Sequence, residues 1–365
     1  MQIFHKVNVD WLGKRRIFLV GSVILLLAGL GSAMVRQLVP GGTEAFNLGV
    51  DFKGGTVVTV KFNQPVSDQQ IRAALVQHSI GESVVQPTDK PNEVLIKVPQ
   101  QGEAAPGEVE ARAQVDKGRD LVVKALETFG PEGKNGQPAN WAYEILQTEA
   151  VGPVAGRQLR NQAIAVTLLA LVGMLLYIGF RFEWTYGAAA VITVFHDVLV
   201  TLGFFSFFQW EISLTVIAAL LTLVGFSVND TIVTFDRVRE NLRLRRRDTL
   251  YNITNEAINQ TLSRTVITGG LVFLSVLAMV LFGGEVLWGF SIALFIGIIT
   301  GTYSTIAIAS PIMVWWQQRV EAAKLRTPSS PKSGGTAEKR GAPTRTRSPK
   351  TSGGVTGEPQ GAVRS

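Results

Sequence analysis

The feature that most constrains this chain is a set of six long apolar runs. They cover residues 17–36, 161–180, 186–208, 212–235, 264–282 and 287–316. A helix that spans a membrane needs about 20 mostly apolar residues to cross roughly 30 Å of hydrocarbon. Each run is close to that length, and 46% of the 365 residues are hydrophobic. The sequence therefore predicts a polytopic α-helical membrane protein with six transmembrane helices.

The first run follows a short basic segment, residues 1–16, which ends in Lys14-Arg15-Arg16. A secretory signal peptide has the same order, but its apolar region is shorter and a small-residue cleavage site follows it. Here the run continues directly into Arg36. We expect this run to be an uncleaved first span.

The positions of lysine and arginine predict the orientation of the spans. The turns at 209–211 and 283–285 contain neither residue, whereas the turns on the opposite side contain Arg181, then Arg237, Arg239, Arg243, Arg245, Arg246 and Arg247, then Arg319 and Lys324. Basic loops remain in the cytoplasm. Both termini are therefore predicted to be cytoplasmic, with the segment 37–160 on the outer side. The net charge of +7 fits contact with membrane lipid and is no sign of nucleic-acid binding.

Residues 37–160 are predicted to form a periplasmic α+β domain. Strand patterns occupy 46–62, 82–87, 92–98 and 141–151, and helical patterns follow Ser67 and cover 108–129. Ser67 and Gln70 form a capping box, which marks a helix start. The order β-α-β-β-α-β is the ferredoxin-like arrangement.

Two cytoplasmic segments complete the chain. In the connection 236–263, Ile253, Ala257, Ile258 and Leu262 recur at helical spacing, which predicts an amphipathic helix along the membrane. The segment 321–365 is basic and rich in Pro, Gly, Ser and Thr. It has too little apolar surface to bury, so it is predicted to be a disordered tail.

The composition argues against several classes of site. The chain has no cysteine and only three scattered histidines, and it lacks an HExxH spacing or a phosphate-binding loop. No nucleophile lies near a base in any recognisable pattern. We therefore predict no metal, no cofactor and no enzymatic activity.

One aspartate interrupts the fourth run. Five uncharged residues separate Asp230 from Asp236, where a dense charged segment begins. At 1.5 Å per residue, Asp230 lies about 9 Å inside that edge. A carboxylate at such depth is costly and usually marks an ion path or a proton relay. The alternative is that Asp230 lies at the membrane surface and ends the helix.

Other polar residues accompany Asp230 within the runs. One predicted face contains Ser227, Asp230, Thr231 and Thr234, beside Asn229; a second contains Thr193, Asp197 and Thr201, beside His196. Arg264 opens the fifth run, and we expect it to pair with Asp230, because isolated ions in lipid are expensive.

The Asp230–Arg264 pair has two interpretations. Burial disfavours an ionised carboxylate whereas a guanidinium favours it, so a site balanced between them can take up and release a proton. Alternatively, the pair is static and serves helix packing. Asp197 and His196 are accessory candidates, or they simply bind neighbouring hydroxyl groups.

Several motifs together resemble one family. They are FNLGVDFKGGT, VGPVAGRQL, HDV, GFSVNDTIVTFDRVREN and LSRT, which begin at residues 46, 151, 196, 225 and 262. Over about residues 5–320 the chain resembles the SecF family, the smaller half of the SecD–SecF accessory complex of bacterial protein export.

The resemblance implies a function and a set of partners. It implies a fold like the resistance-nodulation-division transporters, in the bacterial cytoplasmic (inner) membrane, with SecD supplying six further spans. It also implies coupling to the proton-motive force and action on preproteins at SecYEG, with YajC as a further candidate partner. The aspartate of its NDT motif is Asp230 and the arginine of its SRT motif is Arg264, both implicated in proton conduction. Asp51, Gly54 and Gly55 match its GVDFxGG motif, with an expected structural role.

Two alternatives to a translocation subunit remain at this point. A small-molecule/proton antiporter would need more external substrate-binding volume than one domain of roughly 120 residues offers. A passive membrane scaffold would leave Asp230 and Arg264 dispensable.

Overall fold

The computed structural model describes residues 8–38, 44–88, 90–100, 108–134, 140–181, 183–245 and 247–326. The chain forms two compact units, residues 1–322 and 323–365. The predicted disordered tail lies outside the described residues from 327 onward. Its first residues were predicted wrongly, because the last helix continues to Arg326.

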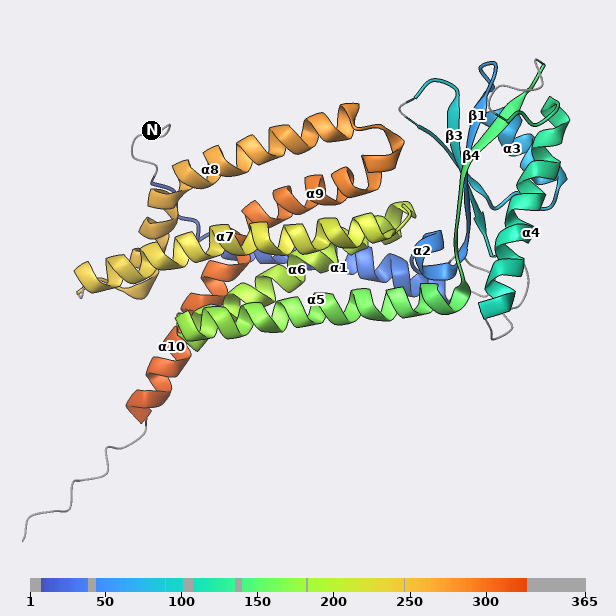
Figure 1. The fold of residues 1–365 in the computed structure, drawn as a ribbon. Coiled ribbons are helices and arrows are strands. Elements are labelled where there is room, and N and C mark those ends of the chain that lie inside the picture. Colours follow the sequence, from blue (N-terminus) through green and yellow to red (C-terminus); the bar gives the residue numbers. More distant parts are fainter. Residues whose placement is uncertain are drawn as a thin grey trace, which may run out of the picture. The chain divides into compact units, whose positions relative to one another are not determined.

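Six helices are long and apolar enough to cross a membrane, which confirms the predicted fold class (Figure 1). They are α1 (Arg15–Leu38), α5 (Pro153–Arg181), α6 (Trp184–Phe208), α7 (Leu214–Leu244), α8 (Leu250–Phe282), and a sixth made of α9 (Gly284–Ser304), a π-helical turn η2 (Thr305–Ala309) and α10 (Ser310–Arg326).

Several helices extend beyond the predicted apolar runs. Helix α7 continues to Leu244, and α8 begins at Leu250, so the connection 236–263 is not a separate helix. The predicted face with Ile253, Ala257 and Ile258 is buried, but it belongs to α8 itself. Apolarity indicates where lipid contact ends, whereas backbone hydrogen bonding continues into the polar flanks.

The α+β domain has the predicted topology. Its strands are β1 (Gly55–Phe62), β2 (Val84–Pro87), β3 (Glu93–Pro99) and β4 (Tyr143–Val151), in the order β2-β3-β1-β4 with every pair antiparallel. Helices α3 (Asp68–Gln77) and α4 (Glu108–Leu126) lie on one face of the sheet (Figure 1). A 3₁₀ turn, η1 (Glu127–Phe129), follows α4. This is the ferredoxin-like arrangement.

The core of this domain follows from strand alternation. Val58 and Val60 of β1 and Ile96 of β3 are 0% exposed and pack against Ile71 of α3 and Val122 of α4. Successive strand side chains point to opposite faces, so the alternate residues meet the helices. The predicted capping box forms, since the Ser67 side chain and the backbone N–H of Gln70 are bonded.

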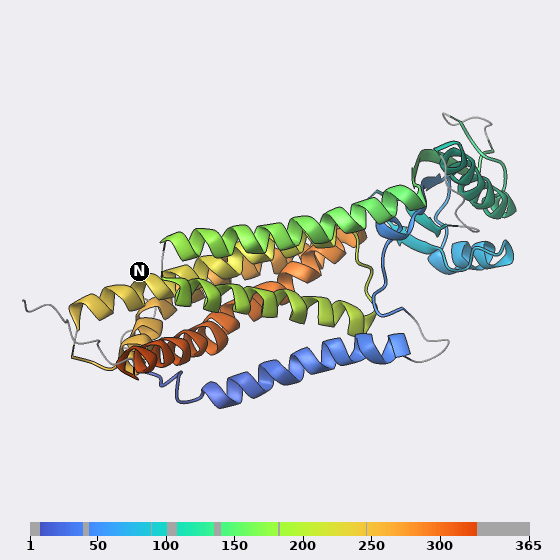
Figure 2. The ribbon, with the colours of Figure 1, turned by 90° about the horizontal axis from the view of Figure 1, so that it is seen from below.

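Glycines set the closest helix contacts in the membrane bundle. A Cβ on Gly29 of α1 would lie 2.5 Å from the Cα of Gly203 of α6, so these backbones touch. Figure 2 shows α1 alongside α6. A Cβ on Gly297 of α9 would lie 2.6 Å from the Leu223 methyl groups of α7. Small residues permit such close approach between membrane helices.

Candidate functional site

The polar face predicted for α7 is buried as a whole. Ser227, Asp230, Thr231 and Thr234 are between 0% and 4% exposed. Residues three and four apart share a helix face, so one buried stripe collects all four. Asn229 lies on the exposed side of the same helix and does not join them.

Asp197 is the centre of a hydrogen-bond network between three helices. Its Oδ2 accepts from Ser227 Oγ of α7 at 2.6 Å and from Ser304 Oγ of α9 at 2.8 Å. Its Oδ1 lies 3.0 Å from His196 Nδ1. Thr193 and Thr201 of the predicted stack are also fully buried, but their hydroxyls donate to backbone carbonyls of α6. Asp197 thus binds neighbouring hydroxyls, which was one of the two alternatives left open by the sequence, and the accessory role stays a prediction.

The π-helical turn in the sixth span adds hydroxyls that the sequence analysis missed. Thr305 Oγ1 lies 3.0 Å from Thr231 Oγ1, and Ser310 Oγ donates to Thr305 O at 3.1 Å. Thr300 and Ser304, four residues apart in an apolar run, were a signal of this polar stripe. Single π turns inside α-helices frequently occur at functional sites.

Asp230 is held differently from Asp197. Its side chain is buried, and Oδ2 has no hydrogen-bond partner among the described residues. Arg264 is the cation whose charge acts on this carboxylate. No ion pair joins the two side chains in the described part of the chain.

The predicted direct pairing of Asp230 with Arg264 is thus not formed in this structure. The buried face of α8 carries Thr261 and Thr265, and Thr261 Oγ1 lies 3.5 Å from Thr234 Oγ1 of α7. Arg264 is one residue from Thr265, so it is turned by about 100° around the helix. It is exposed.

The Asp230 side chain is buried without an ion-pair partner in the described part of the chain, and its carboxyl group can be either ionised or protonated. A buried ionised carboxylate must be paired or must neutralise itself by binding a proton. The ring nitrogen His196 Nε2, like Asp230 Oδ2, is buried and has no hydrogen-bond partner among the described residues. The same residues contain no group of three His, Cys, Asp or Glu that could hold a metal ion.

The residues of the GVDFxGG motif join the sheet to the spans. Asp51 lies in a short helix, α2 (Val50–Lys53), which was not predicted, and its Oδ2 accepts from the backbone N–H of Leu214, the first residue of α7. Gly54 has φ 86°. Gly55 has φ +153°, and a Cβ there would lie 2.4 Å from Val98 O. Both glycines occupy backbone conformations that other residues rarely adopt.

Two further contacts connect the same regions. Lys97 of β3 and Glu211, in the turn between α6 and α7, form an ion pair at 3.0 Å, with side chains 17% and 18% exposed. Ile212 N donates to Asn47 O at 2.8 Å, and Gly49 N donates to Ile212 O at 2.9 Å. The start of α7 is therefore bonded directly to the base of the sheet domain.

Known families match this chain along most of its length. Residues 133–319 match the family described as "Protein export membrane protein SecD/SecF, C-terminal", and residues 42–66 match the "SecD/SecF GG Motif". The first range contains Asp197, Asp230 and the hydroxyl residues around them, and the second contains Asp51, Gly54 and Gly55.

Individual relatives agree. The protein translocase subunit SecF of Koribacter versatilis is 40% identical over 87% of this chain and 94% of its own length. SecF of Pseudomonas aeruginosa is 37% identical over 84% of this chain and 91% of its own.

A solved structure has the same fold. The crystal structure of SecDF, a translocon-associated membrane protein from Thermus thermophilus, superimposes on this chain with a TM-score of 0.68 and a sequence identity of 34%. The match covers 86% of this chain and 39% of the SecDF chain. This multi-pass membrane chain therefore belongs to the SecF side of the SecD/SecF family of protein-export membrane proteins.

Proposed function

We propose that this chain is an accessory subunit of the Sec translocase that uses the proton-motive force, together with SecD, to promote preprotein export across the bacterial inner membrane. Its relatives are named protein translocase subunits, and it spans only 39% of the SecDF chain. The remaining spans of such an assembly come from SecD in this proposal. SecYEG, YajC and preproteins are the further proposed partners.

The observation that carries the proposal is the buried Asp230 carboxylate with an oxygen that has no partner in the described part of the chain. A carboxylate of this kind in a transmembrane helix is a default candidate for a proton relay. Arg264 is always charged, so it tunes the site but does not carry the proton. A passive scaffold held by a static Asp230–Arg264 pair receives no support, because that ion pair is not among those formed by the described residues.

Protonation of Asp230 would change its attraction to Arg264 and so the packing of α7 against α8. Moving one charge across the membrane is worth about 2.3 kcal/mol per 100 mV. That free energy suffices to bias an element with two states of similar stability. Thr231, the next residue of α7, is hydrogen-bonded to Thr305 of η2, so a shift of α7 would be passed to the sixth span.

The signal would reach the sheet domain through the first turn of α7. Asp51 caps that turn, and Glu211 just before it pairs with Lys97 of the sheet. In the proposed orientation both termini are cytoplasmic and the sheet domain is periplasmic. The contacts between the sheet domain and α7 therefore lie at the periplasmic face of the inner membrane. A shift of α7 would there act on the domain that faces the emerging preprotein.

Proton flux in sealed vesicles tests the proposal. Vesicles would contain the full chain with SecD, and flux would be measured with an internal pH-sensitive dye under an imposed potential. Asp230→Asn removes the titratable group and should abolish the flux. Asp236→Asn, a matched change at an exposed position of the same helix, should leave it unchanged. Wild-type flux in Asp230→Asn would refute the proposal.

A further inference from the structure

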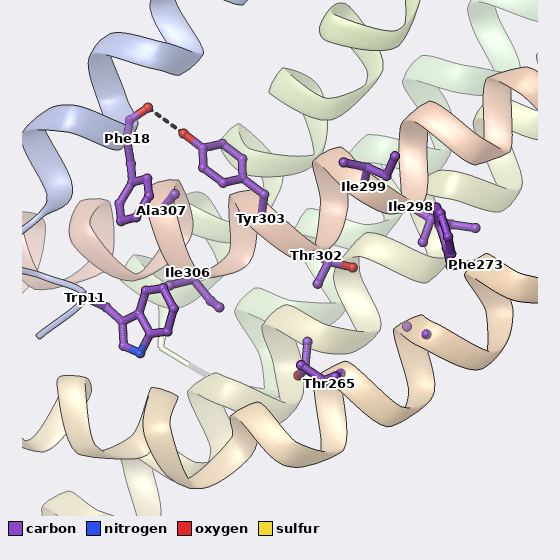
Figure 3. A pocket seen from close by; sticks show the side chains of 13 residues that line it. Trp11, Phe18, Thr265, Phe273, Ile298, Ile299, Thr302, Tyr303, Ile306 and Ala307 are labelled. Atoms are coloured by element: carbon purple, nitrogen blue, oxygen red, sulfur yellow. Dashed lines mark hydrogen bonds between the residues drawn. The ribbon is translucent and has the colours of Figure 1, made fainter. Parts of the chain in front are cut away.

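A groove with a volume of about 400 Å³ lies between α1, α8 and the sixth span. Its apolar lining includes Trp11, Phe18, Gly270, Phe273 and Ile306. Figure 3 shows Trp11 and Phe18 on the α1 side and Thr265 on the α8 side. These residues belong to membrane-spanning helices or their immediate flank, so the groove opens at the depth of the hydrocarbon.

The N-terminal segment forms a fixed wall of this groove. Trp11 Nε1 donates to Asn259 Oδ1 at 3.0 Å, and Trp11 N donates to Asn255 Oδ1 at 2.8 Å. Asp10 accepts from the Tyr251 hydroxyl at 2.6 Å. The Tyr251 hydroxyl and the Gly13 N–H hold the pKa of Asp10 below its usual value. The segment is thus bonded along the first turns of α8.

Basic residues lie in the chain next to residues that line the groove. Lys14, Arg15 and Arg16 lie in the chain between Trp11 and Phe18, and Arg264 directly precedes the lining residue Thr265. All four are exposed. Among the described residues, none forms a side-chain hydrogen bond or an ion pair. The chain segments that line the apolar groove thus carry four exposed cations that form no ion pair among the described residues.

We propose that this groove binds an anionic phospholipid, with an acyl chain between α1 and α8 and the phosphate against Lys14–Arg16 and Arg264. Basic pockets between membrane helices on the cytoplasmic side suit anionic headgroups. The charge of the four exposed cations favours this occupant over an apolar helix of a partner subunit, which would leave the cations without a counter-charge.

Gly270 allows the groove to be filled without disturbing the helix. A Cβ at Gly270 meets nothing within 4 Å, so Gly270→Leu extends into the groove. Gly173 of α5 has the same open surroundings away from the groove and is exposed, so Gly173→Leu is its matched control. A second pair of variants changes charge only. Arg15→Gln with Arg16→Gln acts in the segment between Trp11 and Phe18, and Arg243→Gln in the last turn of α7 with Arg247→Gln in the turn after it is the control.

The test is a titration of the purified full chain, with its partner subunit where it co-purifies, by phosphatidylglycerol or phosphatidylcholine, read by native mass spectrometry. We expect the wild type to bind phosphatidylglycerol more tightly than phosphatidylcholine. The Arg15/Arg16 variant should bind phosphatidylglycerol about tenfold more weakly. Gly270→Leu should lose binding of both lipids, and both controls should match the wild type.

Three results would overturn the assignment. They are equal binding of the two lipids by the wild type, undiminished phosphatidylglycerol binding by Gly270→Leu, and loss of the partner subunit from Gly270→Leu with lipid binding intact. The last result would assign the groove to a partner helix. If Gly270→Leu does not fold, the charge variants decide alone: unchanged binding by the Arg15/Arg16 variant overturns the proposal.

Discussion

At the scale of single residues, two carboxylates in neighbouring spans have opposite surroundings. Asp197 is 0% exposed and contacts two hydroxyls and an imidazole. Asp230 is 4% exposed and has one oxygen without a partner in the described chain. A carboxylate with several partners is fixed in one state, whereas one without them is easier to neutralise. This difference is why we propose the proton exchange for Asp230 and not for Asp197.

Asp197→Ala should therefore destabilise the bundle. The change removes the carboxylate that accepts from the buried hydroxyls of Ser227 and Ser304, and Ser304 keeps only its bond to Gly301 O at 3.2 Å. The loss should be about 3 kcal/mol. The free energy of unfolding in detergent micelles would measure it. Thr222→Ala, at an exposed hydroxyl bonded only within its own helix, should change stability by less than about 0.5 kcal/mol. Equal stability of the two variants would contradict the described network.

The sequence predicted the polar face of α7 because helical periodicity alone decides which residues share a face. It did not predict that Arg264 would miss Asp230, because the rotation of α8 about its axis depends on packing against α7. It also missed Ser304 and Thr305. The π turn shifts the register of the sixth span, and no residue between 305 and 309 signals such a turn.

At the scale of elements, α1 packs against α6 through a close contact between glycines. Much of its surface is exposed, including Ile17, Leu27 and Met34. Its closest approach to α6 is the backbone contact of Gly29 with Gly203. In lipid there is no hydrophobic force between helices, so association relies on such close packing.

Gly203→Leu should separate α1 from α6. The chain has no cysteine, so cysteines placed at Arg36 and Phe207 report on the two helix ends, where the Arg36 guanidinium and the Phe207 carbonyl are 3.3 Å apart. Cross-linking by a short bifunctional maleimide should fall several-fold in Gly203→Leu. In Gly31→Leu, whose added side chain meets nothing within 4 Å, it should be unchanged. Full cross-linking in Gly203→Leu would show that the glycine contact is dispensable.

Element types were easier to predict than element ends. The first and last strands of the sheet domain were expected from alternation, and the two between them as strands joined by a turn. The capping box gave the start of α3. Helix α2 escaped prediction because it has only four residues, too few for any periodicity. The long ends of α7 and α8 escaped because their polar residues contact each other, as Arg237 contacts Gln260 at 2.5 Å, and not lipid.

At the scale of the whole first unit, the sheet domain and the spans are joined by polar contacts at one short turn. The Lys97–Glu211 ion pair is largely buried, and the Ile212 and Leu214 amides are bonded to the segment that leads into β1. Half-buried ion pairs contribute more than exposed ones, because water screens them less.

Reversing either charge should loosen this joint. In Lys97→Glu or Glu211→Lys, like charges face each other, and we expect amide hydrogen exchange in residues 209–216 to accelerate about tenfold or more. The double variant should recover most of the protection. Lys90→Glu alters a 74% exposed side chain and serves as the control. If the double variant exchanges as fast as the single variants, the ion pair does not hold the joint.

Helix α7 runs without a break from the residue capped by Asp51 to Leu244, a length of about 46 Å. A rod of this kind has no hinge in which a displacement could be absorbed. Any axial slide or roll that begins at its middle must arrive at both membrane faces in the same step. The two ends of α7 would then move together, by the same distance and at the same time.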